Sequence, residues 1–85
     1  ATPGVVAALA AHGGARAAMA LLDRHVAGDW GELSAGDKAA NDRERYDPCG
    51  HVLSAYTVGG TRVWIETCWN DEGYRTTVIM LPEER

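Results

Sequence analysis

The feature of this chain that most constrains its fold is a change of period at Gly50. Beyond it, apolar and polar residues alternate as in half-buried strands, and Gly59-Gly60 suits a two-residue hairpin turn. The spacing predicts antiparallel strands over about 51–58, 61–69 and 74–81, with a longer turn at residues 70–73. The predicted core face of the middle strand carries Val63, Ile65, Thr67 and Trp69, and its other face carries Arg62, Glu66, Cys68 and a half-exposed Trp64.

Before Gly50 the signals are helical. The sequence predicts helices over about 3–12, from about 15 to Gly28, and from Lys38 to about Tyr46, the last opened by Ser34 and Asp37 in a variant of the capping box. In the second helix we expect Met19, Leu22 and Val26 to form the apolar face, with Leu21 beside it. Helices followed by strands predict an α+β fold, with two to three N-terminal helices packed on a three-stranded antiparallel β-meander.

Length and charge limit the possible functions. The 85 residues have room for one domain, residues 1–85, and the net charge of −4 disfavours binding to nucleic acid. The N-terminus has no basic region, and the apolar run 5–11 is too short to span a membrane. We therefore expect a soluble cytoplasmic protein that does not contact a membrane.

Several short motifs, spread over nearly the whole chain, also occur in a known group of proteins. They are Thr2-Pro3-Gly4, Arg24-His25, Gly28-Asp29-Trp30-Gly31, Asp37-Lys38-Ala39-Ala40-Asn41-Asp42, Val52-Leu53-Ser54-Ala55-Tyr56, Val63-Trp64-Ile65, Thr67, Thr76-Thr77-Val78 and Leu81-Pro82-Glu83-Glu84. In these the chain resembles short uncharacterised proteins encoded on bacterial plasmids, phages and other mobile genetic elements, some of them labelled as subunit M of a type I restriction system. The resemblance implies an origin on such an element and no particular chemistry.

The restriction label is not expected to describe the activity, because a methyltransferase subunit needs a Rossmann domain and several hundred residues. The chain also departs from the group at residues 68–75, where the group usually places an acidic-Asp-Arg-Ser run before the paired threonines. A function that depends on this loop is therefore not expected to carry over.

The segment from Arg24 to Leu33 places a histidine, an aspartate and a tryptophan at the end of the second helix. His25 suits the last turn of a helix, where a protonated imidazole meets the negative end of the dipole. Asp29 can accept a hydrogen bond from this imidazole or cap the next turn, Trp30 can anchor the loop to the sheet, and Asn41 can fasten the third helix to the loop. With Arg75, these residues are the candidates for a binding motif.

If the protein is an enzyme, His25 is the general acid or base, with partners among Ser54, Tyr56, Thr76 and Thr77 of the sheet. The order of helices before an antiparallel sheet, with a histidine on a helix, resembles the arrangement in barnase-like toxin ribonucleases. Against this alternative stand the negative charge and the lack of a basic pair beside His25.

The cysteines offer little chemistry. Cys49, His51 and Cys68 could approach one another, because an ideal hairpin puts residue 51 opposite residue 68. Their spacing matches no recognised zinc motif, so we expect no metal and no cofactor, and we expect small buried thiols.

The last predicted strand ends in the uncharged run Thr76–Leu81 at the edge of the sheet, where an open strand promotes aggregation. We expect either a homodimer through this edge or a helix across it. The leading functional expectation is a non-enzymatic module that binds a host-encoded or element-encoded protein, and the alternative is the small ribonuclease toxin with His25 as its acid or base.

Overall fold

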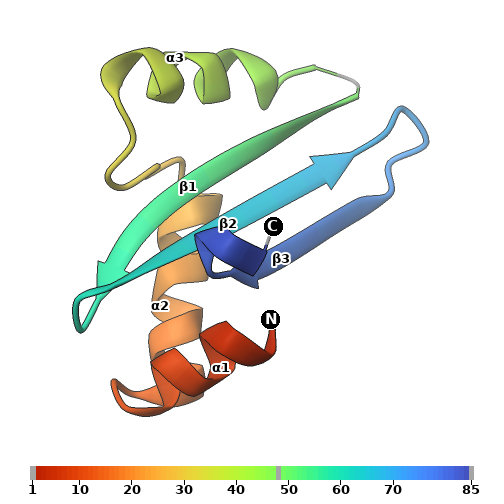
Figure 1. Cartoon of the computed structure of the whole chain (residues 1–85). Helices are drawn as coiled ribbons and strands as arrows, with labels where there is room; N and C mark the ends of the chain where they lie inside the picture. The colour runs from red at the N-terminus through yellow and green to blue at the C-terminus, as the bar shows by residue number, and fades with distance from the viewer. Residues whose placement is uncertain (1, 48, 85) are drawn as a thin grey trace.

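The computed structural model describes residues 2–47 and 49–84 and confirms the α+β fold (Figure 1). Three helices, α1 (Pro3–Ala10), α2 (Gly14–Val26) and α3 (Ala35–Glu44), precede the strands β1 (Gly50–Val58), β2 (Thr61–Trp69) and β3 (Arg75–Met80). A short 3-10 turn, η1 (Pro82–Glu84), follows. The sheet is an antiparallel meander in the order β1-β2-β3, so β1 and β3 are its edges.

The β1–β2 hairpin has the predicted register. Gly59 and Gly60 have φ angles of 56° and 81°, which a two-residue hairpin turn with the twist of the strands requires. His51 therefore lies opposite Cys68, as expected. Val63 and Ile65 are fully buried on the core face, and Trp64 on the other face is half-buried, as predicted.

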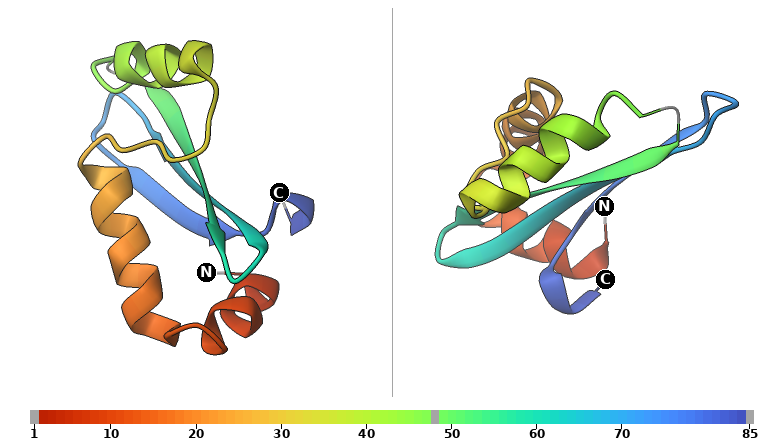
Figure 2. Two further views of the ribbon diagram at one scale, coloured as in Figure 1. Left: turned by 90° about the vertical axis from the view of Figure 1, so that its left-hand side faces the viewer. Right: turned by 90° about the horizontal axis from the view of Figure 1, so that it is seen from above.

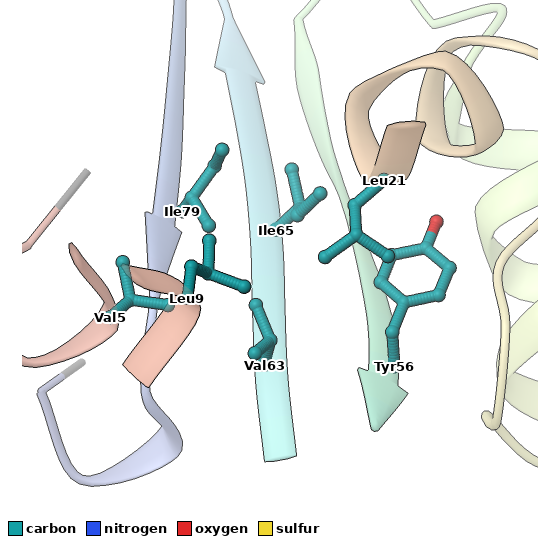
Figure 3. Packing of buried hydrophobic residues seen from close by; sticks show 7 residues of the cluster. All are labelled: Val5, Leu9, Leu21, Tyr56, Val63, Ile65 and Ile79. Carbon is teal, nitrogen blue, oxygen red and sulfur yellow. The ribbon is translucent and has the colours of Figure 1, made fainter. Parts of the chain in front are cut away.

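The hydrophobic core lies between the sheet and the first two helices (Figure 3). It contains Val5 and Leu9 of α1, Leu21 of α2, Tyr56 of β1, Val63 and Ile65 of β2, and Ile79 of β3. The predicted apolar face of α2 is wrong at Met19, which is 58% exposed, and at Val26, which is 74% exposed, whereas Leu22 packs against the core as predicted. The buried pair is instead Leu21 and His25, four residues apart and so on one side of the helix.

Helix α1 covers only one end of the β3 edge. The Thr2 backbone N–H donates to the Ile79 carbonyl over 3.0 Å, and the Thr2 hydroxyl donates to Glu84 instead of capping its own helix. Arg75, Thr76 and Thr77, at the other end of β3, are exposed. The β3 edge is thus covered at Ile79 by the backbone of Thr2, the residue before α1.

The end of α2 before Gly28 and the start of α3 after Ser34 are as predicted, but α3 ends at Glu44 and not at about Tyr46. After α2, Gly28 takes φ 83°, its N–H donates to the His25 carbonyl and the Asp29 N–H donates to the Arg24 carbonyl, which is the Schellman arrangement. At the start of α3 the Ser34 hydroxyl accepts from the Asp37 N–H over 3.1 Å. Tyr46 follows the helix, and its side chain is 82% exposed.

Helix α2 lies along one face of the sheet, and α3 lies beside β1 near the opposite end of the sheet from α1 (Figure 2). The turn between β2 and β3 extends away from all three helices. Among the described residues no single helix is long and apolar enough to cross a membrane, although α1 and α2, bent by 110° at their junction, reach that length together.

Candidate functional site

His25 lies in a chain of hydroxyl groups that is buried at Ser54 and Thr67 and reaches the surface at Thr77. Its Nδ1 is 2.6 Å from the Ser54 hydroxyl, and its Nε2 is 2.9 Å from the Thr67 hydroxyl. The Thr67 hydroxyl lies a further 2.9 Å from that of Thr77, so the chain of contacts crosses all three strands. Both ring nitrogens of the imidazole are thus bound to groups within the fold.

The environment of His25 favours its neutral form. Burial lowers the pKa of the imidazole, and its ring meets the Trp30 ring edge to face at 5.6 Å between centroids. A neutral imidazole has one donor and one acceptor nitrogen. A hydroxyl group can accept a hydrogen bond from the first or donate one to the second. The expectation of a protonated His25 stabilised by the helix dipole is therefore wrong, since desolvation opposes the charge.

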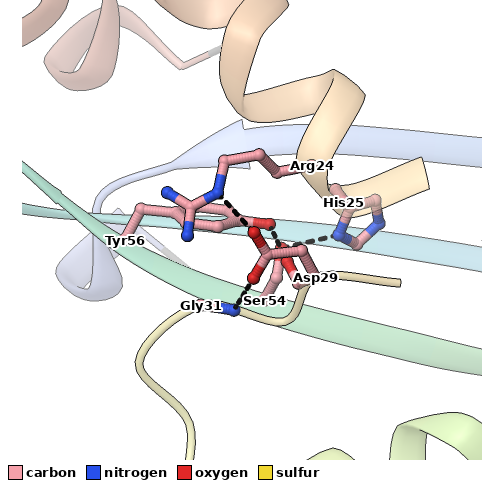
Figure 4. A network of polar contacts seen from close by, with 6 residues as sticks. All are labelled: Arg24, His25, Asp29, Gly31, Ser54 and Tyr56. Atoms are coloured by element: carbon pink, nitrogen blue, oxygen red, sulfur yellow. Dashed lines mark hydrogen bonds and ion pairs between the residues drawn. The ribbon is translucent and has the colours of Figure 1, made fainter. Parts of the chain in front are cut away.

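Asp29 is held next to the buried chain without touching the imidazole (Figure 4). One carboxylate oxygen accepts from Arg24 Nε over 2.7 Å, and the other accepts from the Gly31 N–H over 3.2 Å. The Arg24 bond is the main reason that the pKa of Asp29 is lowered, and the pKa of Arg24 is raised in return. Of the two predicted roles, capping of the next turn is the one that Asp29 has.

Tyr56 joins the ion pair of Arg24 and Asp29 to the core. Its hydroxyl donates to the Asp29 carbonyl over 2.7 Å, and the Arg24 guanidinium lies 4.6 Å from the centre of its ring. Burial raises the pKa of Tyr56, so the phenol stays a neutral donor. Tyr56, predicted as a possible catalytic partner, thus links Asp29 and Arg24 to the core.

The loop after α2 pairs with β1 like a short additional strand. The Ala55 N–H donates to the Trp30 carbonyl over 3.2 Å, and the Glu32 N–H donates to the Ala55 carbonyl over 2.8 Å. Gly31, between them, has φ 72°, and a Cβ there would lie 2.0 Å from the Ala55 carbonyl oxygen. Only glycine permits this approach of the two backbones.

Two neighbouring residues fasten α3 to the rest of the molecule. Asp42 accepts from the Trp30 indole N–H over 2.9 Å. The Asn41 amide donates to the Leu53 carbonyl over 2.6 Å and accepts from the Leu53 N–H over 3.3 Å. Asn41 therefore fastens α3 to β1, and not to the loop after α2 as expected. Asp42 makes the contact with that loop, through Trp30.

A groove of about 520 Å³ opens beside the buried chain, where α2 ends and the sheet continues. Its floor comes from all three strands. Its walls come from the end of α2, from the loop after α2 and from the segment after α3. The lining residues are Leu22, His25, Val26, Trp30, Arg45, Tyr46, Val52, Thr67, Trp69, Arg75 and Thr77. Trp30 is the predicted anchor and is 4% exposed.

The groove is cationic in an acidic protein. None of the twelve Asp and Glu residues, all of them in the described part of the chain, lines it, whereas two of the eight basic residues do. Arg45 lies 5.7 Å from the Trp30 ring centre and 5.8 Å from that of Tyr46, and Arg75 lies 5.7 Å from that of Trp69. Within residues 2–47 and 49–84 neither arginine forms an ion pair.

The predicted site residues divide into three groups. His25, Trp30 and Arg75 line the groove, Ser54 and Tyr56 lie buried behind it, and Asp29 and Asn41 support its walls. Thr76 is not brought to the site, because it pairs with Cys68 and so lies on the other face of the sheet. Thr67 was not predicted, although a hydroxyl in the buried run Val63-Ile65-Thr67 needs a polar partner and was a usable signal.

The cysteines do not match their expected burial, because Cys49 and Cys68 are both exposed. No three His, Cys, Asp or Glu side chains among residues 2–47 and 49–84 gather closely enough to share a metal ion.

Comparison with known proteins adds no homologue. No family model, no curated protein and no solved structure matches this chain. The fold and the site by themselves define a small α+β domain with an open cationic groove beside a buried histidine.

Proposed function

We propose that this protein is a non-enzymatic binding module whose groove takes an acidic segment of a partner protein. The observation that carries the proposal is the composition of the groove: two arginines that form no ion pair within the described residues, the aromatic side chains of Trp30, Tyr46 and Trp69, and no carboxylate, in a protein of net charge −4. Arginine and aromatic side chains are the types that dominate binding energy at protein interfaces. The volume is also within the range of ordinary ligand sites.

The preferred partner segment carries carboxylates and an apolar or aromatic side chain. The carboxylates would meet Arg45 and Arg75, and the apolar group would lie against Trp69 and the exposed Val26. The resemblance to plasmid and phage proteins favours a partner encoded by the host or by the element, met in the cytoplasm.

The same site supports catalysis poorly. A general acid or base must reach a substrate proton, and both nitrogens of His25 are already bound to Ser54 and Thr67. Ser54, which contacts the imidazole, is fully buried and closed to a substrate. For the ribonuclease alternative, a hydrogen bond of His25 to Ser54 or Thr67 would therefore have to break before the imidazole could reach a substrate.

Binding of a synthetic acidic polymer tests the proposal. The probe is a glutamate–tyrosine copolymer, with a lysine–tyrosine copolymer and a single-stranded RNA oligonucleotide as comparisons. We expect the acidic copolymer alone to bind the wild type, and the double variant Arg45→Gln/Arg75→Gln to bind at least about tenfold more weakly.

The matched control is Arg16→Gln, which removes an exposed arginine of α2 outside the groove and should leave the affinity unchanged. Equal binding by the double variant and the wild type would contradict the proposal. Cleavage of the RNA that is lost in His25→Gln would favour the ribonuclease instead.

A further inference from the structure

The turn between β2 and β3 is an acidic projection. It carries Asp71 and Glu72, followed by Tyr74, which is 71% exposed, and Figures 1 and 2 show it extending beyond the helices. Within the described part of the chain neither Asp71 nor Glu72 forms an ion pair. We call residues 70–74 the acidic tip.

The acidic tip has a defined shape although it is exposed. The Asn70 side chain accepts from the Glu72 N–H and the Tyr74 N–H, each over 3.1 Å. The Gly73 N–H donates to the Asn70 carbonyl over 3.0 Å, and the Asn70 N–H donates to the Tyr74 carbonyl over 3.2 Å. A turn that is ordered before binding loses less conformational entropy when it docks.

The acidic tip and the groove are complementary in charge and in side-chain type. The tip offers two unpaired carboxylates and an exposed tyrosine, and the groove offers two unpaired arginines and aromatic walls. The groove residues Trp69 and Arg75 flank the tip on the same hairpin. A twofold axis close to this hairpin would therefore place the tip of each copy over the groove of the other.

We infer that a second copy of this chain occupies the groove, in a dimer in which each copy inserts its acidic tip into the other. This inference rests on the proposed function of the groove and names its occupant. Asp71 and Glu72 meet Arg45 and Arg75 of the second copy, and Tyr74 lies against its aromatic wall. The contact of the homodimer thereby moves from the predicted 76–81 edge to the tip beside it.

The experiment measures the dimer dissociation constant by sedimentation equilibrium. We expect the wild type to dimerise, and we expect Asp71→Asn/Glu72→Gln and Arg45→Gln/Arg75→Gln each to raise this constant at least about tenfold. The control Asp23→Asn, at an exposed position of α2, should leave it unchanged. Circular dichroism checks that each variant is folded.

A charge exchange separates specific docking from a general effect of charge. Asp71→Lys/Glu72→Lys and Arg45→Glu/Arg75→Glu should each be monomeric alone, because tip and groove then carry like charges. Mixed together they should form a one-to-one dimer, because each tip again meets an oppositely charged groove.

A wild type that stays monomeric at millimolar concentration and low salt, or a mixture that does not associate, would overturn the inference. If the acidic copolymer still bound the groove in that case, the proposed function would stand with a different occupant. If neither the copolymer nor a second copy bound, both would fail.

Discussion

At the scale of single residues, His25 acts as a neutral connector between a helix and a sheet. Its two nitrogens join α2 to β1 through Ser54 and to β2 through Thr67, and the chain continues to β3 through Thr77. A buried polar group is stabilising only while its partners are present. The stability of the fold should therefore depend on hydroxyl groups that look ordinary in the sequence.

Removal of one hydroxyl should show this dependence. Ser54→Ala leaves a buried ring nitrogen without a partner, and we expect the free energy of unfolding to fall by about 1–3 kcal/mol. Thr57→Ala, which removes an exposed hydroxyl from the same strand, should cost much less. Urea denaturation followed by tryptophan fluorescence measures both, and equal losses would contradict the role given to His25.

The lowered pKa of His25 also predicts how stability changes with pH. The unfolded chain takes up a proton near the ordinary pKa of about 6.5, whereas the folded protein takes it up only at lower pH. The stabilisation is therefore complete above about pH 6.5 and is lost as the pH falls towards the folded pKa. The pKa values of Asp29 and Glu84 are also lowered, so their stabilising contributions are complete above about pH 5 and are lost as the pH falls further.

Denaturation midpoints between about pH 7 and pH 5 isolate the effect of His25. We expect the wild type to lose stability over this interval and His25→Gln to lose less, because its amide does not titrate. His51→Gln, which replaces an exposed histidine of β1, should keep the wild-type decline. A stability that rises on acidification would contradict the burial of a neutral imidazole.

At the scale of elements, the loop after α2 is joined to β1 by an isolated parallel bridge between Gly31 and Ala55. Its backbone pairs with Ala55, its Asp29 closes a turn, and its Trp30 is fixed by Asp42 of α3. The loop thereby places α3 alongside β1. The groove opens between the C-terminal end of α2 and the segment that follows α3.

Substitution of Gly31 should break this arrangement. A side chain at Gly31 meets both an unfavourable φ of 72° and the Ala55 carbonyl, so we expect Gly31→Ala to cost more than about 3 kcal/mol. Gly60→Ala is the matched control, because φ there is 81° and a Cβ would meet no atom within 4 Å. This control should cost only about 1–2 kcal/mol, and similar values in thermal denaturation would contradict the pairing of the loop with β1.

The elements themselves were predictable from local patterns. The alternation after Gly50, the Gly59-Gly60 turn and the Gly28 and Ser34 caps are local signals, and they gave the fold class and the strand register. The buried face of α2 was not predictable by periodicity alone, because burial of His25 against hydroxyls outweighs burial of Met19 and Val26.

The site was only partly predictable for the same reason. His25, Ser54 and Trp30 could be selected from the sequence, and Thr67 could be placed on the core face by its alternation, but the contact of Thr67 with the His25 ring depends on how α2 packs on the sheet. Arg45 and Tyr46 reach the groove only because Asn41 fastens α3 to the Leu53 backbone. That contact joins residues twelve positions apart and has no local signature.

At the scale of the whole molecule, charge is unevenly distributed. The chain has net charge −4, yet its groove is lined by Arg45 and Arg75 and by no acidic residue. Binding there should be electrostatically steered and should weaken with salt. The buried His25 adds a polar group to the wall of the groove that α2 forms.

We expect the affinity for the glutamate–tyrosine copolymer to fall as salt is raised from about 0.05 M to about 0.5 M, because the arginines are exposed to solvent. Fluorescence anisotropy of a labelled copolymer measures this directly. An affinity that rises with salt would indicate purely apolar binding and contradict the role of the arginines.

The most direct test of the groove as the binding site follows the three indole N–H signals of a ¹⁵N-labelled protein during titration with the acidic copolymer. Trp30 and Trp69 line the groove, whereas Trp64 lies on the other face of the sheet. The signals of Trp30 and Trp69 should shift together and saturate while that of Trp64 stays in place. A shift confined to Trp64, or no shift in any of the three while the copolymer is bound, would contradict the account.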